Sequence, residues 1–265
     1  MPSTAAAQGV LSAEQHVELA TRLGRWRRQP LSPEELAELL PRIADPDLAL
    51  AVGERLGMAG PGAITLILEL CSDGGCSLPL IRALGICHHP QARDQLLQWL
   101  HQAGELRPAV LEALACWGQE IDLSIIESAL AAPAQAERLA GLALLTFRSR
   151  SLSTEALLTL TQPLLNDLRA EVVIATLRLL QRRQEPEILD AINHCISSDA
   201  LPGVAEMAIQ ALGCIGSLES CGLLIQQLQL LNHTPLAPQL RRQLQAQVRH
   251  RSWIALQLQA LNLSL

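Results

Sequence analysis

The sequence contains no lysine and no tyrosine, and its 265 residues include one phenylalanine and four tryptophans. All twenty basic residues are therefore arginine. Without lysine, the chain cannot form a lysine Schiff base and cannot place an ammonium group in a phosphate-binding loop. These absences exclude several classes of enzyme site before any motif is considered.

The shortage of aromatic residues also bears on the fold class. Apolar residues make up 49% of the chain, and Leu, Ala, Ile and Val supply nearly all of them. Strands favour β-branched and aromatic residues, whereas Leu and Ala favour helices. Since Leu and Ala dominate, the composition predicts an all-α protein.

Charge and hydropathy narrow the choice of partner and compartment. The net charge is −6, with arginines spread along the chain, which argues against a nucleic-acid partner. No apolar run reaches eighteen residues, so no membrane span is expected, and the first eight residues lack a signal-peptide pattern. Seven cysteines occur without regular pairing, which is typical of buried thiols in a reducing cytoplasm.

One pattern recurs six times along the chain. A helix ending in paired aliphatic residues is followed by a short turn, and a second helix then carries a small residue and a leucine. The marker leucines of the second helices lie 28 to 35 residues apart, at Leu56, Leu84, Leu114, Leu144, Leu177 and Leu212. A single hairpin cannot bury its apolar stripe, so neighbouring hairpins are expected to stack and share one core. We expect Leu84, Leu114 and Leu212 to be fully buried.

The repeats resemble the HEAT-repeat family, in particular the short bacterial units known as phycobilisome-lyase HEAT-like repeats. The run from Asp45 to Gly57 and the pair Leu106-Arg107 come closest to the family unit, which reads aliphatic helix, Asp, Val-Arg, spaced alanines and Leu-Gly. Most repeats lack the family's arginine, and the fifth runs one residue out of frame. The resemblance implies a right-handed α-solenoid of helical hairpins, an armadillo-like superhelix.

The ends of the chain depart from the repeat, as caps of a solenoid must. We expect a tail and capping helix over 1–31, with Leu19, Leu23 and Trp26 on the apolar face of the helix. Six HEAT-like repeats follow over 32–216. An irregular capping repeat over 217–265, broken between Asn232 and Pro238, completes one continuous solenoid.

Several groups of reactive side chains invite a catalytic or metal interpretation. Cys71 and Cys76, together with the run Cys87-His88-His89, could supply zinc ligands. The repeat frame places the two groups in turns on opposite edges of the stack, which favours buried cysteines over a metal site. The pairs Cys116-Trp117 and His194-Cys195 fall in different repeats, so we expect no catalytic residue, no metal and no cofactor.

Arginine gathers in three places, at 25–28, 182–183 and 241–251. Such clusters usually form a solvated face of a protein. The alternative is a binding surface for an acidic protein partner.

The most useful prediction concerns the concave face, which the second helices of a HEAT stack line. Counting along each second helix predicts a groove formed by Leu50, Glu54, Leu78, Arg82, Glu112, Arg138, Leu142, Glu171, Glu206 and Gln210. The charged residues should form ladders, and the leucines should be exposed anchors. The small residues Gly57, Gly85, Ala115 and Gly213 should let a partner approach the backbone closely.

Such a groove predicts a non-catalytic interaction scaffold or assembly factor that binds a folded protein or a protein helix. The resemblance implies an alternative, a phycobilin lyase subunit or a phycobilisome assembly or degradation factor, whose partner would carry a bilin. If the chain is an enzyme, we expect a lyase of this kind, although the predicted groove has no aromatic residue to stack on a bilin.

Overall fold

The structure is a computed structural model that describes residues 9–25, 28, 30–197 and 199–264. Those residues form α-helices and short 3-10 helices, with no strand among them. The helices are α1 (Ala13–Gly24), α2 (Pro33–Leu39), α3 (Pro46–Met58), α4 (Ile64–Gly74), α5 (Leu78–Cys87), α6 (Pro90–Leu100), α7 (Arg107–Ala113), α8 (Leu123–Leu130), α9 (Gln135–Arg148), α10 (Thr154–Leu165), α11 (Ala170–Leu180), α12 (Pro186–Asn193), α13 (Val204–Ile215), α14 (Leu218–Leu231), α15 (Ala237–Gln245) and α16 (Arg251–Ala260). The all-α prediction is confirmed for the described residues.

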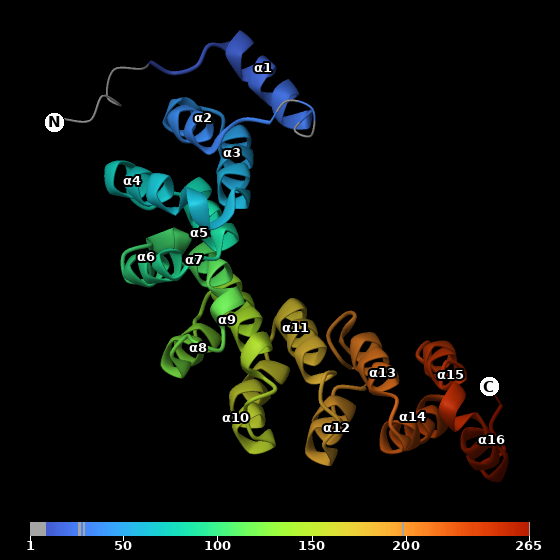
Figure 1. Ribbon diagram of the computed structural model, residues 1–265. Helices are drawn as coiled ribbons and strands as arrows, with labels where there is room; N and C mark the ends of the chain where they lie inside the picture. The colour runs from blue at the N-terminus through green and yellow to red at the C-terminus, as the bar shows by residue number, and fades with distance from the viewer. Residues whose placement is uncertain (1–8, 26–27, 29, 198, 265) are drawn as a thin grey trace. The chain divides into compact units, whose positions relative to one another are not determined.

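The chain divides into two compact units, Met1–Ile121 and Asp122–Leu265. In the first unit, α2, α4 and α6 pack on one another in turn, and so do α3, α5 and α7. Figure 1 shows α2, α4 and α6 on one side of the row formed by α3, α5 and α7. Each predicted repeat of this unit is therefore a hairpin with one helix in each row, and α1 packs against α3.

The second unit has the same two-row construction. Its first helices α8, α10, α12, α14 and α16 contact one another in sequence, as do its second helices α9, α11, α13 and α15. The pair α14 and α15 thus continues both rows, and the capping role of 217–265 stays a prediction. Leu224, Leu228, Leu240 and Leu244 are buried in it and supply the stripe that a regular repeat needs.

The marker leucines occupy the core of both units. All six are 0% exposed, which confirms the expected burial of Leu84, Leu114 and Leu212 and supports the repeat frame. Leu19 and Leu23 are buried on α1, as its apolar pattern predicts, whereas Trp26 lies outside the described residues.

Local signals explain where the second helices begin. Asp45 caps α3 by accepting a hydrogen bond from the Leu48 amide at 2.7 Å, and Pro46 occupies the first turn, where its missing N–H costs nothing. At the far end of α5, His88 adopts a left-handed conformation (φ 49°) that terminates the helix.

Glycines set the spacing of the second helices in the first unit. A Cβ atom at Gly53 would lie 2.4 Å from the Pro79 carbonyl oxygen, and one at Gly57 would lie 2.6 Å from that of Ala83. At these two positions only glycine therefore allows the observed approach of α3 to α5.

The expectation that Gly57, Gly85 and Gly213 admit a partner is wrong. Gly57 and Gly85 face the neighbouring helices α5 and α7, and Gly213 lies under Gln243 of α15. These residues bring helices of the stack together, so they leave no room for an external chain.

Candidate functional site

The ten predicted groove residues are divided between the two units. Leu50, Glu54, Leu78, Arg82 and Glu112 lie in the first unit and Arg138, Leu142, Glu171, Glu206 and Gln210 in the second. Of the first five, Leu78, Arg82 and Glu112 are exposed and the other two are half-buried. The first unit therefore presents its part of the predicted face to solvent.

Exposed and half-buried residues on the second helices of the first unit recur every four positions, which keeps them on one helix face. Three rows run across α3, α5 and α7 as a result. The first apolar row is Leu50, Leu78 and Pro108, the charge row is Glu54, Arg82 and Glu112, and the second apolar row is Met58, Ile86 and Cys116 of the 3-10 helix Ala115–Trp117. The sequence analysis missed the second apolar row, although extending the same count by four residues finds it.

The second apolar row is well exposed for its residue types. Met58 is 60% exposed and Ile86 41%, compared with 37% for Leu78 in the first apolar row. Apolar side chains on consecutive helices form a contiguous patch, and such patches mark interaction sites more often than scattered apolar residues do.

Contacts between the helices fix the direction of the rows. Gly53 lies beside Pro79 and Gly57 beside Ala83, so Arg82 sits about two residues further along its helix than Glu54 does. Gly85 lies beside Ala113, which gives Glu112 the same offset of about two residues from Arg82. Two residues of helix rise correspond to about 3 Å. The offset is therefore equal at both steps of the charge row.

The charge row is not neutralised within the protein. Glu54, Arg82 and Glu112 have no hydrogen bond or ion pair from their side chains to any residue that the structure describes. The row therefore offers an acidic, a basic and an acidic group in line, with free hydrogen-bonding capacity.

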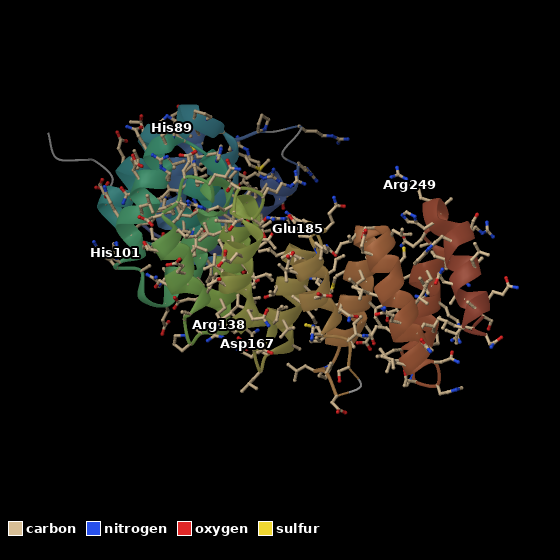
Figure 2. The ribbon with its side chains drawn as sticks, turned by 90° about the horizontal axis from the view of Figure 1, so that it is seen from below. His89, His101, Arg138, Asp167, Glu185 and Arg249 are labelled. Atoms are coloured by element: carbon tan, nitrogen blue, oxygen red, sulfur yellow. The ribbon has the colours of Figure 1, made fainter. Side chains whose placement is uncertain are left out.

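Arg138, in the second unit, has a structural role that the sequence analysis did not anticipate. Its guanidinium bonds the Asp167 carboxylate and, through Nε, the Ala132 carbonyl oxygen at 2.6 Å. Figure 2 labels Arg138 and Asp167, which come from neighbouring hairpins. The charge of Arg138 is therefore compensated within the fold, and its contact with a partner stays a prediction.

Asp167 is the centre of this network. Its side chain is 2% exposed and also accepts hydrogen bonds from Arg169 Nε at 2.8 Å and Nη2 at 2.9 Å. The hydrogen bonds from Arg169, with smaller help from Arg138, outweigh desolvation and lower the pKa of the Asp167 carboxyl to about 2. Arg169 also donates to the Pro133 carbonyl oxygen at 2.8 Å. The network thus joins the turns before α9 and α11.

Leu142 is not the exposed anchor that the repeat count predicts. It is 3% exposed. The adjacent Gly141 lies close to Ala129 and Leu130 of α8. The apolar anchors of the predicted set are therefore reduced to Leu50 and Leu78.

The three other residues that the repeat count assigns to the groove in the second unit lie on the surface. Glu171, Glu206 and Gln210 are exposed, although the Glu171 carboxylate accepts a hydrogen bond from Gln135. The backbone carbonyl of Glu206 accepts a hydrogen bond from Gln239 at 2.7 Å.

Two arginines of the expected solvated clusters also bind within the fold. Arg183, whose side chain is 12% exposed, pairs with Glu185 and donates to the Ser149 carbonyl oxygen at 2.7 Å. Arg241 donates to the Ser264 carbonyl oxygen at 2.9 Å. Their neighbours Arg182 and Arg242 are exposed, so the clusters are only partly a solvated face.

The cysteines and histidines are mostly engaged in packing and capping. The Cys71 thiol is buried, and desolvation, with a smaller contribution from Cys76, raises its pKa to about 12. Cys87 donates to the Gly60 carbonyl oxygen at 3.2 Å. His88 stacks on Trp117 with ring centroids 4.7 Å apart, and His89 caps α6. Burial also raises the pKa of Cys195, which makes its thiol a poor nucleophile.

No group of three or more His, Cys, Asp or Glu side chains that could hold a metal ion occurs within the described ranges. In the same residues, no helix has the length and apolarity that a membrane crossing requires.

Comparisons with protein-family models, curated proteins and solved structures find no match to this chain. The HEAT-like resemblance and its bilin-related alternative therefore stay predictions.

Proposed function

We propose that the chain is a HEAT-like α-solenoid that acts as a non-catalytic scaffold or assembly factor. It binds a protein partner on the second-helix face of its first unit, across α3, α5 and α7. One observation carries the proposal, namely the unpaired charge row Glu54, Arg82 and Glu112, which lies between the half-buried first apolar row and the more exposed second apolar row.

This arrangement has the composition of a protein-binding surface. Apolar anchors supply most of the affinity of an interface, and the charges around them select the partner and fix its register. An isolated exposed charge contributes only about 0 to 1 kcal/mol, so the argument depends on three charges acting together.

The same surface is poorly suited to catalysis. Its polar groups are set out in a line along three helices, whereas a catalytic pocket gathers them around one reacting atom. We therefore favour binding over chemistry for this face.

The test uses the exposed Arg82 and an arginine on the second unit as its control. A tagged parent protein captures partners from its native organism, and the captured protein is identified and purified. Arg82→Glu should then weaken its binding about tenfold or more, because the central contact of the charge row becomes repulsive. Arg178→Glu, a change of an exposed arginine on α11, should leave the affinity unchanged.

Loss of binding with Arg182→Glu or Arg242→Glu, combined with full binding by Arg82→Glu, would contradict the proposal. Arg138 is unsuitable for this test because changing it would break the contact with Asp167. Thermal denaturation of each variant checks that the fold is intact.

A further inference from the structure

The geometry of the three rows specifies the kind of partner segment that fits them, provided that the proposed function holds. We infer that this segment is an α-helix that lies along the charge row and crosses α3, α5 and α7. It presents a basic, an acidic and a basic side chain at seven-residue intervals, opposite Glu54, Arg82 and Glu112.

The seven-residue interval follows from the spacing of the helices. Packed helices lie about 8 to 10 Å apart, and the glycine contacts place α3 and α5 at close range. With an offset of about 3 Å at each step, successive members of the charge row are about 9 to 10 Å apart. Seven residues of a helix span about 10.5 Å and return to nearly the same face.

An extended partner does not fit the same row. Side chains on one face of a strand repeat about every 6.6 to 6.8 Å, so three consecutive positions cannot all meet charges about 9 to 10 Å apart. A nucleic acid is also disfavoured, because two of the three groups in the row are carboxylates. A helix is the regular element whose repeat matches the row.

The apolar rows predict the residues between the charges. On a helix, the residues three and four positions after a charged residue lie on opposite sides of it. Apolar residues at those positions would rest on the first apolar row and the second apolar row, where Leu78 and Ile86 flank Arg82. The expected partner motif is basic-x-x-Φ-Φ-x-x-acidic-x-x-Φ-Φ-x-x-basic, in which Φ is a large apolar residue.

The experiment uses fluorescein-labelled synthetic helical peptides and the full chain. The matched peptide carries Arg, Glu and Arg in the motif, and the inverted peptide carries Glu, Arg and Glu with every other residue unchanged. Fluorescence anisotropy should show the parent protein binding the matched peptide about tenfold more tightly. The triple variant Glu54→Arg/Arg82→Glu/Glu112→Arg should reverse this preference, which a general loss of structure cannot do.

A third peptide carries the same charges six residues apart, so that they no longer lie on one helix face. It controls for electrostatic attraction that does not depend on the spacing of the charges, and it should bind no better than the inverted peptide. Equal binding of the matched and inverted peptides by the parent would overturn the inference, as would an unchanged preference in the triple variant. If the triple variant fails to fold, Arg82→Glu alone should still reduce the ratio of the affinities for the matched and the inverted peptide.

The two proposals fail in different ways. If Arg82→Glu weakens capture of the native partner but the peptides are not distinguished, the face binds protein and the helical motif is wrong. If Arg82→Glu leaves the native partner unaffected, the binding face itself is wrong.

Discussion

At the scale of single residues, the chain uses arginine to join neighbouring hairpins. Arg138, Arg169 and Arg183 each donate to backbone carbonyl oxygens of another segment and to a carboxylate. A planar guanidinium with five donors can satisfy several acceptors at once, which a lysine ammonium cannot do in one plane. The arginine-only composition is consistent with this use.

The first prediction concerns Asp167, whose pKa is about 2 against an ordinary value of 3.8. A carboxyl whose pKa is lower in the folded than in the unfolded chain stabilises the fold at any pH above the unfolded-chain pKa. This contribution to stability is lost as the pH falls through the folded-chain pKa. Asp167→Asn should therefore destabilise the protein by on the order of 2 kcal/mol at pH 7. The difference from the parent should shrink between about pH 4 and pH 2.

Urea denaturation at several pH values measures this effect. Asp190→Asn, a change of an exposed aspartate on α12, is the control and should have little effect at any pH. A deficit in Asp167→Asn that stayed constant down to pH 2 would show that the buried carboxylate is not the cause.

At the scale of helices, close packing depends on residues without side chains. Gly53 and Gly57 stand one turn apart on α3 and both face α5, and the contact between these two helices is extensive. Glycine inside a helix costs about 1 kcal/mol relative to alanine, so its presence here reflects a packing requirement.

The second prediction compares two changes from glycine to alanine. Gly57→Ala places a Cβ atom 2.6 Å from the Ala83 carbonyl oxygen, which forces the helices apart. It should cost about 1 to 3 kcal/mol despite the better helix propensity of alanine. Gly74→Ala, in α4, meets nothing within 4 Å and should be neutral or stabilise by about 0.5 kcal/mol. Thermal and chemical denaturation measure both, and the same sign for both would refute the packing argument.

At the scale of the whole molecule, the chain comprises two units built on one plan, each with a row of first helices and a row of second helices. In such repeats each hairpin contacts only its neighbours along the row, so stability is spread over many similar interfaces. Arginine networks, buried apolar stripes and glycine contacts all stabilise the interfaces between hairpins, and none of these features requires a bound metal ion.

The third prediction is that metal removal leaves the protein unchanged. Because no metal-binding group of side chains is gathered in the described part of the chain, elemental analysis of native protein should find no stoichiometric zinc or iron. A chelator should not shift the melting temperature. One tightly held metal per chain would contradict this, and substituting Cys71 or His89 would then identify its ligands.

The sequence by itself determined which residues form the core. Leucine and alanine recur at helical spacing, and burial of a periodic apolar face is a local consequence of that pattern, so all six marker leucines could be located. The exposed Arg82 and Glu112 followed from the same count, because solvent faces the side of a helix that the core does not occupy.

Only the tertiary structure decided which of the remaining polar and small residues are available to a partner. Arg138 bonds Asp167 across a repeat boundary, Leu142 is buried, and Gly57 lies against Ala83. Each of these outcomes depends on helix spacing and turn conformation. A repeat count fixes the position of a residue along its own helix, but it does not measure the distance to the next one.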